Sequence, residues 1–273
     1  MNRFVVALIN GIVPALSASR FNPIELLQPQ SRARRNGFRY VFITIQFVVA
    51  IALMIGLVGI QKQIHFVKTK DLGFDSEYLL RVRPVGSLGN HASSIKDQLL
   101  DHSNILKVSL SGGSPFDIGG WASGTVTSNG REIRFEEMSQ LSVDKSFIET
   151  FKIPVIKGRN FKSSDKNACI INKKTYNKLG WKNLHNKTFF GRKVVGVISD
   201  IHYQDIHQPI GSLQLYFASD FSYIHVMNIR IKGTDLRASI NHIKKVIKEF
   251  DPSARINYTF YDDIVNRMLE KEE

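Results

Sequence analysis

The feature that most constrains the fold is an uncharged, apolar run between Tyr40 and Gln61. Its core, Val41 to Ile60, matches the roughly 20 apolar residues that a helix needs to span a bilayer. A buried helix of a soluble protein rarely reaches this length without a charged residue. We therefore predict a transmembrane helix over residues 40–61.

The charges on either side of this helix predict its orientation. Residues 20–39 carry five arginines against the single acid Glu25, whereas the lysines after the helix are balanced by Asp71, Asp75 and Glu77. Positive loops stay on the cytoplasmic side of a membrane. We therefore expect residues 20–39 in the cytoplasm and everything after residue 61 on the outer side.

A second apolar stretch, residues 4–18, lies close to the first residue. It follows Arg3 and ends in small residues, as a signal peptide does. Cleavage there would place the arginine-rich stretch outside the cytoplasm, against the orientation rule. We interpret residues 1–39 instead as the end of an earlier membrane segment followed by a cytoplasmic linker.

Beyond the membrane helix, two stretches show the same strand-helix-strand pattern. In the first, Tyr78–Val85 alternates as a half-buried strand, a helix places Ala92, Ile95 and Leu99 on one face, and Leu106, Val108 and Leu110 form a second alternating strand. The glycine-rich turn at residues 111–116 ends this first unit.

The second unit begins with a strand over Tyr223–Ile231. Apolar residues then recur every three or four positions from Leu236 to Phe250, which is typical of an amphipathic helix, and Asp251-Pro252 ends it. The closing strand alternates at Ile256, Tyr258 and Phe260.

Between the two units we expect a mainly β insertion over about residues 117–195. It contains candidate strands at Gly124–Ser128, Glu132–Phe135 and Gln140–Val143, a short helix near Ser146–Phe151, and turns at Gly130 and Gly158. The predicted fold class is α+β, with the transmembrane helix followed by an extracytoplasmic domain over residues 62–269.

Composition and motifs exclude several kinds of chemistry. The formal charge of +13 is spread along the chain and no nucleic-acid-binding motif accompanies it, so we expect no nucleic-acid partner. Cys169 is the only cysteine, which rules out an intramolecular disulfide and a zinc cluster, and its apolar neighbours favour a buried thiol. No Gly-x-x-x-x-Gly-Lys-Ser/Thr loop is present to hold ATP phosphates.

Two other clusters resemble a metal site and a nucleophilic site. Asp200, His202 and His207 could suggest a metal, but a strand followed by a loop lacks the fixed spacing of a His-x-x-x-His helix, so turn contacts are the better interpretation. Ser111 and Ser114 lie beside glycines without a nucleophile elbow, and no histidine and aspartate can be tied to them. We predict no catalytic, cofactor-binding or metal-ligating residue.

Nine ordered stretches resemble a known family, the MacB-type (FtsX-like) permeases of ABC transporters. They are Phe21-Asn-Pro-Ile-Glu-Leu-Leu27, Gln46-Phe47, Asp71-Leu-Gly-Phe74, Phe147-Ile-Glu-Thr-Phe151 with Gly158-Arg-Asn-Phe161, Ile170-Ile-Asn172 with Leu179-Gly-Trp181, Val194-Val-Gly-Val-Ile-Ser-Asp-Ile-His202, and His207-Gln-Pro-Ile210. The set covers nearly the whole chain in family order.

The resemblance implies a split subdomain built from the two strand-helix-strand units, with a second subdomain inserted, carried on membrane helices in the bacterial inner membrane. It also implies partners: a separate ABC ATPase, further permease helices or a second copy, and a periplasmic or outer-membrane protein. Because a permease half would continue into further membrane helices, the chain resembles the central fragment of a longer permease.

On this basis we expect a permease component that is not an enzyme and whose periplasmic domain couples ATPase-driven motion to export or extraction of a substrate. The main alternative is a membrane-anchored sensor or adhesion domain, which has the same gross layout. It would require a cytoplasmic output domain, and the short segment before residue 40 offers none. A membrane-anchored enzyme ranks third, because no nucleophile, base and oxyanion set is found.

The predicted orientation can be tested with reporter fusions in a bacterial host. Alkaline phosphatase fused after Gly180 should be active because it folds only outside the cytoplasm, whereas a fusion after Arg35 should be inactive. A β-galactosidase fusion at the same two positions is the control and should give the opposite pattern. Phosphatase activity only after Arg35 would reverse the orientation.

Overall fold

The computed structural model describes residues 32–68, 72–85, 91–218 and 226–270, which belong to two separate units, one ending at Thr69 and one beginning at Lys70. The predicted apolar segment 4–18 and the motif at residues 21–27 lie outside the described residues, as do residues 223–225 of the second predicted unit.

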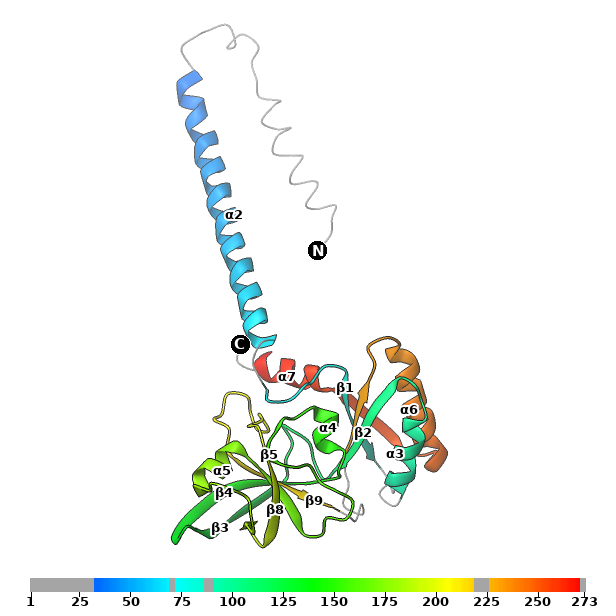
Figure 1. Ribbon diagram of the computed structural model, residues 1–273. Helices are drawn as coiled ribbons and strands as arrows, with labels where there is room; N and C mark the ends of the chain where they lie inside the picture. Colours follow the sequence, from blue (N-terminus) through cyan, green and yellow to red (C-terminus); the bar gives the residue numbers. More distant parts are fainter. Residues whose placement is uncertain (1–31, 69–71, 86–90, 219–225, 271–273) are drawn as a thin grey trace. The chain divides into compact units, whose positions relative to one another are not determined.

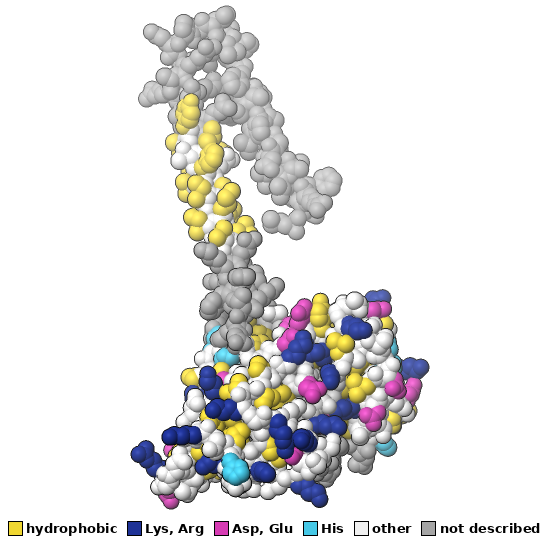
Figure 2. All heavy atoms as spheres, in the orientation of Figure 1, with side chains coloured by type: hydrophobic (Ala, Val, Ile, Leu, Met, Phe, Trp, Pro, Cys, Tyr) yellow, Lys and Arg dark blue, Asp and Glu magenta, His cyan; other side chains and the backbone are white. Residues whose placement is uncertain are grey.

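The first unit contains one long helix, α2 (Arg32–Lys68). Its stretch Tyr40–Gly59 has a mean hydropathy of 2.7 and none of it is buried within the protein, so it is long and apolar enough to cross a membrane (Figure 2). Thr44, a polar residue of this stretch, donates its hydroxyl to the Tyr40 carbonyl oxygen at 2.8 Å, which satisfies that hydroxyl within the helix. The helix matches the predicted span but begins eight residues earlier.

The two predicted strand-helix-strand units interleave in a single four-stranded arrangement (Figure 1). Its strands follow the order β11-β1-β10-β2 and every neighbouring pair is antiparallel, which is the split βαβ arrangement that the resemblance implies. The elements are β1 (Leu79–Val85), α3 (Ala92–Leu100), β2 (Ile105–Ser111), β10 (Val226–Ile231), α6 (Leu236–Phe250) and β11 (Arg255–Phe260).

The period of two in these strands decides which side chains meet the helices. Leu80 and Val82 of β1 join Met227 and Ile229 of β10 in a buried apolar cluster beneath α3 and α6. The predicted helix-face residues Ala92, Ile95 and Leu99 are all buried in the same cluster. This apolar face is the main hydrophobic core of the four-stranded part.

The sheet continues past β2 in the order β4-β9-β6-β8-β5, while β3 pairs with β4 and β7 with β8. Only one residue pair, Ser111 and Val143, joins β2 to β4. The remaining elements are β3 (Gly120–Ser128), β4 (Arg131–Val143), α4 (Phe147–Phe151), β5 (Val155–Gly158), β6 (Ala168–Asn172), α5 (Lys173–Leu179), β7 (Thr188–Phe189), β8 (Arg192–Ile198), β9 (Ser212–Phe217) and α7 (Tyr261–Glu270). The fold class is α+β, as predicted.

Three details differ from the sequence predictions. Leu106 is 45% exposed because the pairing of β2 with β10 shifts between Lys107 and Ile105, so the alternation breaks there. The two strands predicted at 132–135 and 140–143 form one strand, β4, because β3 and β9 pair with successive parts of it. Strands outside the four-stranded part run on to Phe217, past the predicted end of the insertion at about residue 195. The division into domains stays a prediction.

Candidate functional site: the junction segment and its anchors

The segment that connects α2 to the sheet, residues 72–78, is held by backbone contacts to three different parts of the domain. We call it the junction segment. The Leu72 carbonyl oxygen accepts from the His202 amide at 2.9 Å, the Asp75 amide donates to the Phe151 carbonyl oxygen at 3.0 Å, and the Tyr78 carbonyl oxygen accepts from the Ile231 amide at 3.0 Å. Only residues 69–71 separate this segment from the end of α2 at Lys68.

Arg230 on β10 is the central anchor of the junction segment. Its side chain is 5% exposed. It donates through Nε to the Thr150 carbonyl oxygen at 2.7 Å, through Nη1 to the Glu77 carbonyl oxygen at 2.8 Å, and through Nη2 to the Asp75 carbonyl oxygen at 2.6 Å. A planar guanidinium can reach several acceptors at once, so one side chain joins β10, α4 and the junction segment.

The charge of Arg230 is balanced by Asp75, whose Oδ1 lies 3.5 Å from Nη1. Burial lowers the pKa of Arg230, and Asp75 opposes that effect. Burial alone would raise the pKa of Asp75, but hydrogen bonds from Lys152 and the Glu77 amide, together with the Arg230 charge, hold it below its usual value. Asp75 is therefore ionised at neutral pH, as its pairing requires.

Aromatic side chains of α4 and α7 pack against the same segment. Phe74 lies against Phe151 with ring centroids 5.5 Å apart and against Tyr261, the first residue of α7, at 6.1 Å. The Tyr261 hydroxyl donates to Asn228 Oδ1 at 2.7 Å, and Asn228 in turn donates to Ser111 Oγ at 2.9 Å. The junction segment and α7 thus pack on strands β10 and β2, on the face of the sheet opposite α3 and α6 (Figure 1).

Gly73 allows the closest backbone approach in the junction segment. Its φ is +75°, and a Cβ added there would collide with the carbonyl oxygen of Asp200. Asp200 itself accepts from Asn172 Nδ2 at 2.9 Å and from the Lys174 amide at 2.8 Å, at the start of α5. The Asp71-Leu-Gly-Phe74 and Asp200-Ile-His202 motifs therefore meet in space, which explains why a glycine stands at position 73.

The candidate metal cluster of Asp200, His202 and His207 makes structural contacts. Asp200 caps α5, His202 holds Leu72 through its amide, and the His207 amide donates to Asp205 Oδ1 at 3.0 Å. Within the described residues, no group of three histidine, cysteine, aspartate or glutamate side chains is placed to hold a metal ion.

The candidate nucleophiles Ser111, Ser114 and Cys169 also make structural contacts. Ser111 Oγ donates to the Gly113 carbonyl oxygen at 2.5 Å, and Ser114 Oγ accepts from Arg81 Nη1 at 3.4 Å. Cys169 is buried as predicted, and that burial raises the pKa of its thiol to about 11. A thiol with so high a pKa is protonated at neutral pH and is a weak nucleophile.

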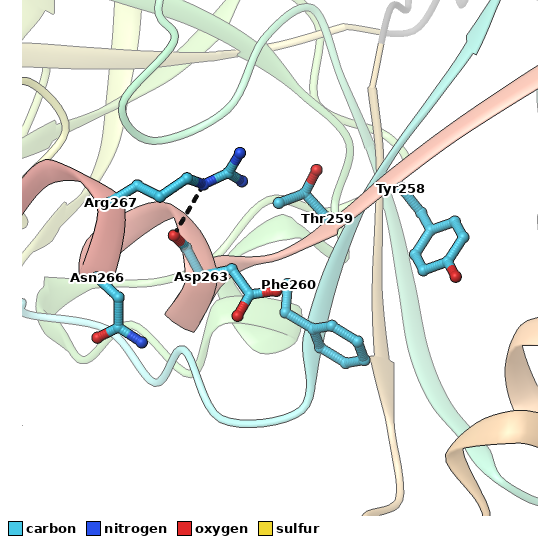
Figure 3. A pocket seen from close by; sticks show the side chains of 6 residues that line it. All are labelled: Tyr258, Thr259, Phe260, Asp263, Asn266 and Arg267. Carbon is cyan, nitrogen blue, oxygen red and sulfur yellow. Dashed lines mark hydrogen bonds between the residues drawn. The ribbon is translucent and has the colours of Figure 1, made fainter. Parts of the chain in front are cut away.

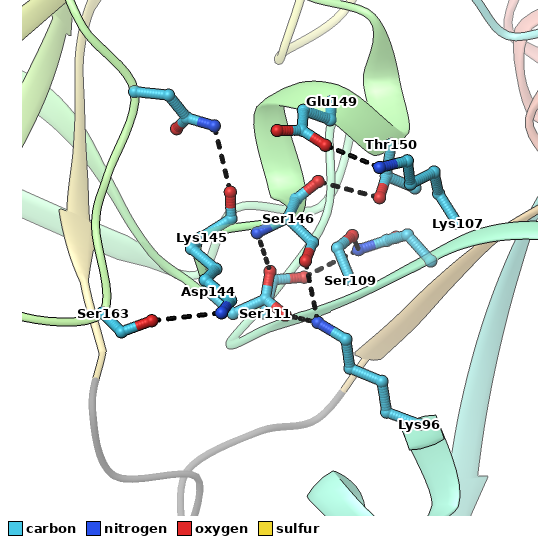
Figure 4. A network of polar contacts seen from close by, with 12 residues as sticks. Lys96, Lys107, Ser109, Ser111, Asp144, Lys145, Ser146, Glu149, Thr150 and Ser163 are labelled. Carbon is cyan, nitrogen blue, oxygen red and sulfur yellow. Dashed lines mark hydrogen bonds and ion pairs between the residues drawn. The ribbon is translucent and has the colours of Figure 1, made fainter. Parts of the chain in front are cut away.

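A second polar network connects α3, β4 and α4 (Figure 4). Lys96 Nζ lies 2.6 Å from Asp144 Oδ2 and donates to Ser146 Oγ at 2.9 Å, and the Asp144 side chain is only 4% exposed. Burial raises the pKa of Asp144, and Lys96 opposes this rise. Together with the single β2–β4 residue pair, this network links the four-stranded part to the inserted strands.

Sequence reasoning missed the main anchors of this site. Arg230 occupies a position on β10 that the alternation pattern assigns to the face away from α3 and α6. From the sequence alone, a charged residue on that face is predicted to be exposed to solvent. The Asp71-Leu-Gly-Phe74 motif is the one sequence signal for this site, because it belongs to the family resemblance, but it does not indicate which residues it contacts. Its partners are distant in the chain, so no local pattern could connect them.

Comparisons with known proteins show what the domain is similar to. No family model and no curated protein matches the chain. Among solved structures, the periplasmic region of MacB from Actinobacillus actinomycetemcomitans aligns with a TM-score of 0.49 and 13% identity, covering 75% of this chain and 97% of that one.

Two further solved structures align over similar lengths. A domain of a putative permease protein from Porphyromonas gingivalis has a TM-score of 0.43 and 12% identity, covering 69% of this chain and 93% of that one. The extracellular domain of the noncanonic ABC-type transporter YknZ from Gram-positive bacteria has a TM-score of 0.44 and 13% identity, covering 66% and 99%.

The contact at Gly73 can be tested against a matched glycine. Gly73→Ala and Gly130→Ala both place a Cβ at a φ near +75°, but Gly130 has nothing within 4 Å of that position. Gly130→Ala should lower the free energy of unfolding by about 1 to 2 kcal/mol, the cost of left-handed backbone. Gly73→Ala should lose about 1 to 3 kcal/mol more because it also overpacks the contact with Asp200.

The measurement is urea unfolding of the full chain in detergent, followed by tryptophan fluorescence. The change in this signal reports mainly on Trp181, which is buried in the domain, because Trp121 is already exposed in the folded state. Equal losses in the two variants would show that the approach of residue 73 to Asp200 does not anchor the junction segment.

The Lys96–Asp144 pair predicts a pH-dependent effect. Lys96→Met should cost about 3 kcal/mol at pH 7, because it leaves a buried carboxylate without its partner. That loss should shrink as the pH falls, since the folded-state pKa of Asp144 is already raised by burial and would rise further, so the carboxyl group becomes neutral. Unfolding curves at several pH values measure both effects.

Lys107→Met is the matched control for this prediction, because the pair between Lys107 and Glu149 has both side chains about half exposed. It should cost no more than about 0.5 kcal/mol. A pH-independent loss in Lys96→Met would contradict the assignment of Asp144 as a buried charge.

Proposed function

We propose that this chain is a permease component of an ABC transporter in the bacterial inner membrane, with its α+β domain in the periplasm. In this role the domain couples motion driven by a separate ATPase to export or extraction of a substrate. The proposal is supported by the ordered resemblance to MacB-type permeases, the apolar helix α2 and the arginine-rich residues 20–39.

The observation that carries the proposal is the anchoring of the junction segment. A helix that shifts in the membrane can move an outer domain only if the segment between them is fixed to that domain. Residues 72–78 are fixed through Arg230 to β10 and α4, through Leu72 and Gly73 to the loop at 200–202, and through Phe74 to α7. Movement of this segment therefore acts on both the four-stranded part and the inserted strands.

Two further contacts strengthen this anchoring. Ser76 Oγ donates to Asp262 Oδ1 on α7, and Lys152 Nζ lies 2.6 Å from Asp75 Oδ2. A sensor or adhesion domain needs only a tether between membrane and domain, and a tether does not require a buried arginine with three carbonyl partners. The anchored geometry favours transmission of force over simple attachment.

The proposed source of that force is an ATPase on the cytoplasmic side, because the sequence has no phosphate-binding loop of its own. If residues 62–269 lie outside, residues 20–39 offer a cytoplasmic surface, and neighbouring membrane helices of the permease are the alternative contact. The arginines of this stretch provide a charged contact for a partner.

This proposal predicts which residues retain the ATPase. The full chain, captured through a tag from membranes of its own organism, should bring down an ABC ATPase identified by mass spectrometry. Replacing Arg32, Arg34 and Arg35 with glutamate should reduce the recovered ATPase at least about tenfold, since charge reversal turns attraction into repulsion at the contact. The orientation of the variant is checked with the same reporter fusions, because these arginines also set topology.

Reversal of three exposed charges on α6, Arg237→Glu, Lys245→Glu and Lys248→Glu, is the matched control and should leave the recovered ATPase unchanged. Recovery of a sensor kinase in place of an ATPase would favour the sensing alternative. Nucleotide hydrolysis by the purified chain alone would contradict the proposal.

A further inference from the structure

A hollow of about 450 Å³ lies on the face of the sheet that α7 covers. Its lining residues come from β1, the turn after β2, and α7: Arg81, Arg83, Phe116, Asp117, Ile264, Arg267 and Met268. Arg81 and Arg83 point into it because they alternate with Leu80 and Val82, which face the opposite cluster. The volume is within the range of sites for small molecules.

The charges in this hollow do not balance. Three arginines line it against one carboxylate, Asp117. Arg83 forms an ion pair with Asp117, which leaves Arg81 with distant partners, Asp117 Oδ2 at 3.9 Å and Ser114 Oγ at 3.4 Å. The Arg81 side chain is only 16% exposed. A mostly buried guanidinium with such long contacts is poorly compensated for its lost hydration.

Arg267 supplies the third positive charge from α7. Its Nε donates to the Asp263 carbonyl oxygen at 3.1 Å, one turn earlier in the same helix (Figure 3). Among the described residues, no carboxylate lies within ion-pair distance of its guanidinium. Arg267 also lines a second hollow with Thr259 and Asn266, and Thr259 is the cross-strand partner of Arg81. Asp263 also lines this second hollow, so the excess of arginines over carboxylates is limited to the first hollow.

The same hollow has an apolar wall. Phe116 and Met268 are partly buried and Ile264 is 7% exposed, and all three belong to or pack against the hydrophobic cluster that contains Phe74 and Tyr261. An inorganic anion would use the arginines and leave this wall in contact with water. A ligand with a charged head and an apolar chain would use both parts.

We propose that this hollow binds an amphipathic anion, a molecule with a phosphate or carboxylate head on an alkyl or acyl chain. Arg81, Arg83 and Arg267 hold the head, and Phe116, Ile264 and Met268 contact the first part of the chain. The inference rests on the residues of the domain itself and stands apart from the transport function, so either can fail without the other.

The test uses the full chain in an uncharged detergent and calorimetric titration with three probes. Dodecyl phosphate below its micelle concentration should bind. Inorganic phosphate, which has the head without the chain, and dodecyltrimethylammonium, which has the chain with the opposite charge, should bind at least about tenfold more weakly. This comparison distinguishes an amphiphile site from a free phosphate site.

Substitutions then locate the binding. Arg267→Gln and Arg83→Gln should each weaken dodecyl phosphate about tenfold, the value of one charge-assisted contact. Arg237→Gln removes an exposed arginine from α6, on the other face of the sheet, and should leave the Kd unchanged. Met268→Ser should weaken dodecyl phosphate while changing the weak binding of inorganic phosphate less than twofold.

Three results would overturn the proposal. Dodecyl phosphate affinity unchanged in both Arg267→Gln and Arg83→Gln would remove the site from this hollow. Inorganic phosphate binding as tightly as dodecyl phosphate would remove the apolar part. Equal binding of dodecyltrimethylammonium would show that the chain alone drives association. Trp181 fluorescence of each variant confirms that the domain remains folded.

Discussion

The structure of the domain depends on one buried side chain, Arg230. Moving a guanidinium out of water is costly, and the cost is offset here by three backbone carbonyl oxygens and the Asp75 carboxylate. Those carbonyls belong to two segments that are distant in sequence, the junction segment and the end of α4. Because the charge cannot remain buried without them, the arginine fixes where both segments lie.

This arrangement follows from a sheet that is covered on both faces in different ways. The face under α3 and α6 is apolar and could form in many small domains. The opposite face carries Asn228 and Arg230, whose hydrogen bonds are directional and reach specific partners in α4, α7 and residues 72–78. Arg81 on the same face donates to Ser114 in the turn after β2. Apolar packing on one face supplies stability, and polar contacts on the other specify geometry.

How far the sequence predicted this structure depends on the range of the interactions. The transmembrane span, the two strand-helix-strand units and the burial of Ile95, Leu99 and Cys169 follow from local periodicity, and all were predicted. Leu106 was placed in the core because one sequence does not show a register shift. The sequence predicts Asp262 and Asp263 on a solvated helix face, and both lie in helix α7, but the contact of Asp262 with Ser76 could not be predicted because the two residues are distant in the chain.

The same limit applies to the candidate sites. Alternation correctly put Arg81 and Arg83 on one face of β1, but their half-burial depends on α7, which lies about 180 residues away in sequence. The roles of Arg230 and Gly73 likewise depend on residues distant in the chain: Arg230 binds residues 75–77 and 150, and Gly73 packs against residue 200. A pattern of single residues can predict the face of a strand, whereas the partner that covers this face is decided by tertiary topology.

Helix α7 connects the two sites. Its first turn holds the junction segment through Asp262 and Tyr261, and its last two turns contribute Ile264, Arg267 and Met268 to the hollow. An anion held between Arg81 and Arg267 would add a link between β1 and α7 and remove the repulsion between the two guanidinium groups. Ligand at 100 times its Kd stabilises the state that binds it by about 2.7 kcal/mol. Because α7 also positions residue 76, that energy would act on the junction segment.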